Sequence, residues 1–81
     1  MRVNEGGEGE AVRLEGEVLH AVIDRAYAPG APVTLSLAIG EAPLSLAGKT
    51  IGSKRRDDGR FDVRLRLTNV RREERELLRG L

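Results

Sequence analysis

The chain has 81 residues, enough for one small domain and too few for a second hydrophobic core. Hydrophobic residues make up 40% and charged residues 33%, a balance typical of a globular protein. The 14 basic and 13 acidic residues leave a net charge of only +1, so the overall charge indicates neither a nucleic-acid nor a membrane partner. Because cysteine is absent, disulfides, thiolate catalysis and cysteine-based zinc sites are excluded.

The chain shows no segment suited to membrane insertion or export. No apolar run approaches the roughly 18 residues of a spanning helix, and residues 1–10 are too acidic for a signal peptide. We therefore expect a cytoplasmic protein without membrane insertion. Glutamine is absent and methionine occurs once, a depletion of labile side chains that resembles thermophile proteins.

Residues 1–10, MRVNEGGEGE, contain little that a core can bury, and they predict a flexible tail before a single domain at 11–81. From Ala11 onward, Val12, Leu14 and Val18 alternate with charged residues, as in a half-buried strand. Gly16 falls within this alternation and indicates a bulge or a close backbone approach.

Residues 18–23 are apolar on both faces, which fits either a strand covered on both sides or a short helical turn. Alternation then predicts strands at 33–39, at about 44–51 and at 61–67. Residues 53–59 form a polar hairpin tip in which Asp58-Gly59 supplies the turn.

After Leu67 the apolar period becomes helical. Val70, Leu77, Leu78 and Leu81 form one stripe of a helix at about 70–80, with Asn69 as its expected N-cap. The fold class is therefore all-β, a small antiparallel β-barrel whose opening is covered by a C-terminal α-helix.

The order of these elements resembles the PilZ domain family. Residues 29–52, PGAPVTLSLAIGEAPLSLAGKTIG, are similar to two consecutive strands of that family. Residues 59–81, GRFDVRLRLTNVRREERELLRGL, are similar to its final strand and closing helix. The resemblance implies a six-stranded antiparallel barrel in a bacterial-like protein, often one that binds the second messenger cyclic di-GMP.

The chain departs from both motifs that carry cyclic di-GMP binding in that family. The Arg-x-x-x-Arg clamp is missing, because Arg2 is the only basic residue before the first predicted strand. In place of the Asp/Asn-x-Ser-x-x-Gly motif, the sequence places His20, Val22 and Arg25 at the three defining positions. The resemblance therefore implies a degenerate PilZ-like domain that does not bind cyclic di-GMP in the usual way.

The two-sided apolar segment is covered either by the protein's own helix or by another chain, and we predict an interface with a second copy or a protein partner. We expect Leu19, Ile23 and Tyr27 near that contact, with Tyr27 as its anchor. His20 is the only histidine, and a structural role is expected for it, with no metal site.

The basic hairpin is the second candidate site. Lys54, Arg55, Arg56 and Arg64 are the candidate anion contacts, but acidic neighbours in the same hairpin offset their charge. We therefore expect a solvated hairpin with weak phosphate binding and do not expect a nucleic-acid partner. We expect no enzyme activity, no cofactor and no catalytic residues, since no nucleophile and base fall in register. The predicted function is a non-enzymatic PilZ-like interaction or adaptor module. The alternatives are a cyclic di-GMP receptor with unconventional contacts and a small nucleic-acid-binding barrel that uses the Lys54–Arg66 surface.

Overall fold

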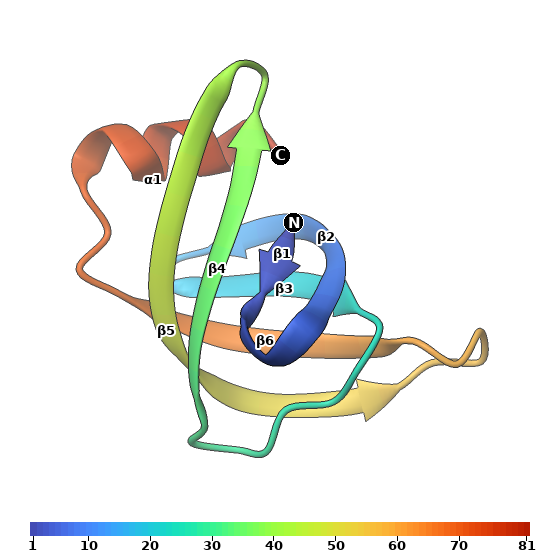
Figure 1. The fold of residues 1–81 in the computed structure, drawn as a ribbon. Helices are drawn as coiled ribbons and strands as arrows, with labels where there is room; N and C mark the ends of the chain where they lie inside the picture. Colours follow the sequence, from blue (N-terminus) through green and yellow to red (C-terminus); the bar gives the residue numbers. More distant parts are fainter.

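The computed structural model describes all 81 residues and contains six strands followed by one helix. The elements are β1 (Arg2–Val3), β2 (Gly7–Glu15), β3 (Val18–Ile23), β4 (Pro32–Ile39), β5 (Ala42–Arg55), β6 (Phe61–Thr68) and α1 (Arg72–Arg79). The strands form one closed antiparallel barrel in the order β1-β2-β3-β6-β5-β4 (Figure 1). The predicted fold class, an antiparallel barrel with a C-terminal helix, is confirmed.

The first ten residues are part of this barrel, so the prediction of a flexible tail at 1–10 is wrong. β1 pairs with both β2 and β4, and its two pairings with β4 close the ring. Val3 is 5% exposed and belongs to the core. The glycines that suggested flexibility allow close packing instead. A Cβ at Gly7 would lie 2.1 Å from Tyr27 Oη, and a Cβ at Gly9 would lie 2.0 Å from the carbonyl oxygen of Val22.

Gly16 lies in the turn between β2 and β3, not within a strand. Its φ of 58° is in the left-handed region that glycine tolerates, and the hairpin reverses there. Residues 18–23 form a strand, and this resolves the choice between strand and helical turn. The two-sided apolar pattern of β3 is covered by the chain itself. Val22, on the outer side, is only 8% exposed, and the Arg60 guanidinium donates to its carbonyl oxygen at 3.4 Å.

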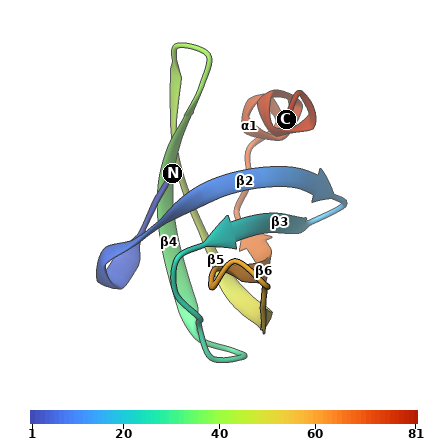
Figure 2. The ribbon, with the colours of Figure 1, turned by 90° about the vertical axis from the view of Figure 1, so that its right-hand side faces the viewer.

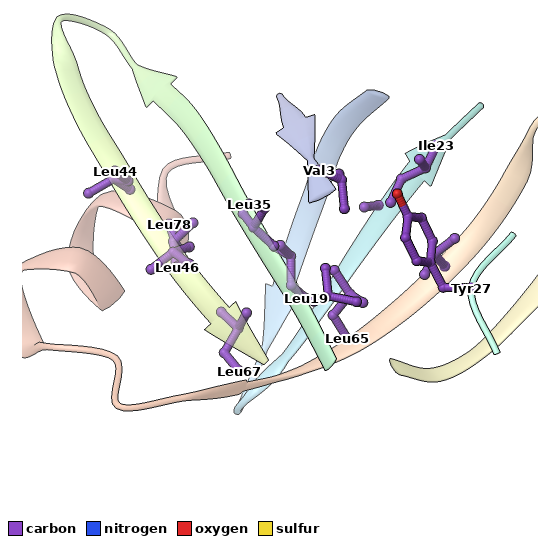
Figure 3. Packing of buried hydrophobic residues seen from close by; sticks show 13 residues of the cluster. Val3, Leu19, Ile23, Tyr27, Leu35, Leu44, Leu46, Leu65, Leu67 and Leu78 are labelled. Carbon is purple, nitrogen blue, oxygen red and sulfur yellow. The ribbon is translucent and has the colours of Figure 1, made fainter. Parts of the chain in front are cut away.

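The core fills the inside of the barrel from end to end. At one end of the cluster are Tyr27, Val3 and Ile23, and at the other are Leu44 and Leu46 of β5 with Leu78 of the helix (Figure 3). The Tyr27 hydroxyl donates to the carbonyl oxygen of Asn4 at 2.8 Å. These contacts attach the N-terminal strand to the far end of the core.

The β4–β5 hairpin extends beyond the rest of the barrel, and α1 lies between this hairpin and β2 (Figures 1 and 2). Leu78 is fully buried, Val70 and Leu77 are partly buried against the core, and Leu81 is 43% exposed. The helix therefore covers the opening as predicted, with Leu78 as its main apolar contact.

The helix begins two residues later than predicted. Arg71 is the N-cap, and its N–H donates to Glu74 Oε1 at 2.9 Å. Asn69, the expected N-cap, has a φ of 55° and turns the chain from β6 toward the helix. Asparagine tolerates this left-handed conformation better than most residues do, which explains its place at the turn.

Candidate anion-binding face

The residues predicted to form an interface lie in the core. Leu19 and Ile23 are 0% exposed and Tyr27 is 5% exposed. All three belong to the single buried cluster inside the barrel. The prediction that they contact a second chain is therefore wrong, because the barrel and its helix already cover them.

The structure brings three of the four predicted anion contacts, Lys54, Arg56 and Arg64, to one groove, whereas the register of β5 directs Arg55 away from them. Lys54 lies opposite Asp62, with both side chains on the outer face, and Arg64 lies two residues further along β6 on the same face. Arg55 lies opposite Phe61, and its side chain projects to the other side of the hairpin. Arg56 lies beyond the end of β5 and is held by acidic neighbours.

Two further cations, Lys49 and Arg66, join Lys54 and Arg64 on the outer face. Lys49 and Arg66 are directly opposite each other in the β5–β6 ladder. We call these four exposed side chains, Lys49, Lys54, Arg64 and Arg66, the basic face. None of the four takes part in an ion pair. Sequence reasoning left Lys49 out of the candidate site and treated Arg66 only as part of a general basic surface.

A β-bulge brings the two lysines to the same face. Lys49 and Lys54 are an odd number of residues apart, so a regular strand would point their side chains in opposite directions. The register shifts between Thr50 and Gly52, and the extra residue, Ile51, restores the outward direction for Lys54. The hydrophobic pattern of β5 carries no clear signal for this shift.

The acidic residues at the border of the basic face are engaged by other arginines. Arg56 Nη1 lies 2.9 Å from Asp62 Oδ1, and Arg56 Nε lies 3.4 Å from Asp58 Oδ2. The hydrogen bond to Asp62 raises the pKa of Arg56. The backbone N–H of Arg60 lowers the pKa of Asp58. Asp62 therefore already has a cationic partner outside the basic face.

A similar arrangement borders the other side, on β2 and β3. Arg13 Nε donates to Glu15 Oε1, and this hydrogen bond lowers the pKa of Glu15. His20 Nε2 lies 3.6 Å from the same carboxylate oxygen. His20 also lies between Arg13 and Arg64 in the register of β2, β3 and β6, so it extends the row of nitrogen-bearing side chains across three strands.

The surface next to Arg64 is hollowed into a groove of about 490 Å³. Gly52 lies opposite Arg64 and has no side chain, and a Cβ there would lie 3.4 Å from Arg64 Nη2. Lys54, His20 and Arg13 line the same groove, together with Arg56 and the Asp62 carboxylate that Arg56 binds. The groove therefore presents several nitrogen donors around a small central space, and its one carboxylate, Asp62, is paired with Arg56.

A second depression, of about 590 Å³, lies over β1, β4 and β5. Its polar lining is mostly of small uncharged side chains, Thr34, Ser36, Ser45 and Thr68, and its one charged side chain is Arg2. It therefore offers much less charge to a ligand than the groove beside Arg64.

Comparison with protein-family models, with curated proteins and with solved structures finds no match for this chain. No helix of the structure has the length and apolar character needed to cross a membrane.

Proposed function

We propose that this chain is a non-enzymatic interaction module that binds an anionic partner through the basic face. The observation that carries the proposal is the direct opposition of Lys49 and Arg66 without an acidic partner. Like charges opposite each other in a sheet destabilise the free protein. A bound anion removes this repulsion, because it places negative charge between the two cations.

The chemistry of the face also supports binding by charge. Guanidinium groups form paired hydrogen bonds to phosphate or carboxylate oxygens, and Arg64 and Arg66 stand two residues apart on one strand. The backbone is paired with a strand on both sides at Lys49, Arg64 and Arg66, and with β6 at Lys54, so it is held in place before a ligand arrives. Little ordering of the backbone is needed on binding.

The proposal includes that the interaction module is a PilZ-like domain. It is supported by the six antiparallel strands followed by a helix, the order that the sequence resemblance implies. The basic face includes neither of the family's cyclic di-GMP motifs. We therefore expect a dissociation constant for cyclic di-GMP near millimolar at best, or about −4 kcal/mol in binding free energy. A micromolar constant by calorimetry would support the alternative of an unconventional receptor.

Calorimetric titration with inorganic polyphosphate and with polyglutamate at low salt tests the proposed function. We expect the wild type to bind at least one of these polyanions, and the Arg64→Glu/Arg66→Glu variant to bind it at least about tenfold more weakly, about 1.4 kcal/mol. The matched control is Arg72→Glu/Arg79→Glu, which makes the same change of charge on α1. Equal losses in both variants, or no binding by the wild type, would contradict the proposal.

A further inference from the structure

The basic face is a two-row array of cations on a rigid support. Arg64 and Arg66 are about 6.6 Å apart along β6, and the neighbouring row on β5 lies about 4.8 Å away. Lys49 stands beside Arg66, and Lys54 lies toward the opposite end of β5. The array therefore extends along the strands and presents more than one positive charge to a ligand with regularly spaced negative groups.

An acidic peptide fits this surface poorly. Extended peptides commonly dock on sheets by adding a strand to an exposed edge, where backbone groups are unpaired. Lys49, Arg64 and Arg66 each have a paired strand on both sides, and Lys54 is paired with β6 alone. A ligand on the basic face contacts side chains only, so the ligand must bring its own fixed arrangement of charges.

Single-stranded nucleic acid also fits less well than a duplex. Proteins that bind single strands combine positive charge with aromatic side chains on which the bases stack. The only aromatic residues here are Tyr27, which is buried, and Phe61, which packs against the core. A duplex keeps its bases inside and presents its phosphates in fixed positions, so it requires no stacking surface.

We propose that the basic face binds the phosphate backbone of double-stranded nucleic acid without reading its sequence. This inference rests on the proposed function and names the class of its partner. Lys49, Lys54, Arg64 and Arg66 supply the phosphate contacts, and the groove beside Gly52 leaves space for a phosphate next to Arg64. Binding of this kind releases counterions and depends steeply on salt.

The salt dependence of duplex affinity tests the inference quantitatively. Four phosphate contacts predict a slope of about −3.6 for log affinity against log salt, and hence roughly 150-fold weaker binding when salt rises from about 50 to about 200 mM. The Arg64→Gln/Arg66→Gln variant removes two contacts and should show a slope of about −1.8. The probes are two short DNA duplexes of unrelated sequence, which we expect to bind equally well.

A Gly52→Glu variant provides an independent readout, because it places a carboxylate in the groove at a position where a Cβ meets no backbone. We expect it to remain folded and to bind the duplexes at least about tenfold more weakly at low salt. The control Arg72→Gln/Arg79→Gln should leave the slope unchanged. A slope that does not change in Arg64→Gln/Arg66→Gln would contradict both this inference and the proposed function.

Other probes separate the two claims. Three other probes are polyglutamate, single-stranded DNA and vesicles of anionic phospholipid. If any of them binds as tightly as the duplex, the duplex inference is wrong and the proposed function still stands. If polyphosphate binds through Arg64 and Arg66 while neither duplex binds, the duplex inference is also wrong and the proposed function again stands. If no polyanion binds at low salt, both the inference and the proposed function are wrong.

Discussion

Lys49 and Arg66 face each other across β5 and β6 on the outside of the barrel, and neither has an acidic partner. Most other charged pairs of this surface are arranged favourably. Arg56 is held by Asp62, and Arg13 is held by Glu15. The repulsion between Lys49 and Arg66 is therefore a local exception, and it lies at one end of the basic face.

The first prediction concerns the stability of the free protein. Arg66→Glu replaces a repulsive cross-strand pair with an attractive one and should raise the free energy of unfolding by about 0.2–1 kcal/mol. Urea denaturation at low salt measures this change, and the gain should shrink in high salt because the charges are screened. Arg72→Ala, on the exposed side of α1, should stay within about 0.5 kcal/mol of the wild type. A clear loss of stability in Arg66→Glu would show that the pair is not repulsive.

The second prediction concerns the attachment of the N-terminal strand. Tyr27→Phe removes the hydrogen bond to the Asn4 carbonyl and should cost about 1 kcal/mol in urea denaturation. Gly7→Ala should cost more, because its Cβ would lie 2.1 Å from the Tyr27 hydroxyl oxygen. Part of the Gly7→Ala cost should disappear in the Tyr27→Phe background, since the colliding oxygen is gone. Strictly additive costs would contradict this contact.

The third prediction concerns pH. Burial raises the pKa of the Tyr27 phenol above its ordinary value near 10. The neutral phenol is therefore favoured in the folded state, and its contribution to stability is present below pH 10 and lost as pH rises through the folded-state pKa. Because Tyr27 is the only tyrosine, an absorbance titration reports on it directly.

We expect the phenolate to form at higher pH in the folded protein than in urea. Tyr27→Phe should show a shallower fall in stability above pH 10, because it lacks the titrating group. Identical titration curves in the folded and unfolded states would contradict the buried placement of the ring.

The fourth prediction concerns the closing helix. The Leu78 side chain of α1 is fully buried, so Leu78→Ala should lower the free energy of unfolding by about 2–5 kcal/mol. Leu81→Ala should cost much less, because Leu81 is 43% exposed. Thermal or urea unfolding of the two variants measures both costs. Similar small effects at the two positions would show that the helix is not docked through Leu78.

Hydrophobic alternation predicted the later strands and the helix well. Every second residue of β4 and β6 is buried or half-buried, so their pattern is visible without tertiary information. The first ten residues were mispredicted because glycine in a sequence can indicate either a flexible segment or a site of close packing. Gly7 and Gly9 allow close packing against Tyr27 and β3, and a composition rich in glycine and glutamate indicates flexibility when these contacts are unknown.

The candidate site was only partly predictable. Lys54 and Arg64 were identified from the basic hairpin, but the bulge at Ile51 determines that Lys49 shares their face. The interface prediction for Leu19, Ile23 and Tyr27 was wrong because it assumed that one helix covers little of a two-sided strand. The closed barrel covers the inner side of β3.

The most direct test of the account is a map of backbone amide shifts by nuclear magnetic resonance during titration with inorganic polyphosphate. We predict that the largest changes occur along β5 and β6, at Lys49, Gly52, Lys54, Arg64 and Arg66. We also predict that α1 and the depression over β1 and β4 stay unchanged. Changes centred on α1, or shifts spread evenly over the surface, would contradict the claim that the basic face is the binding site.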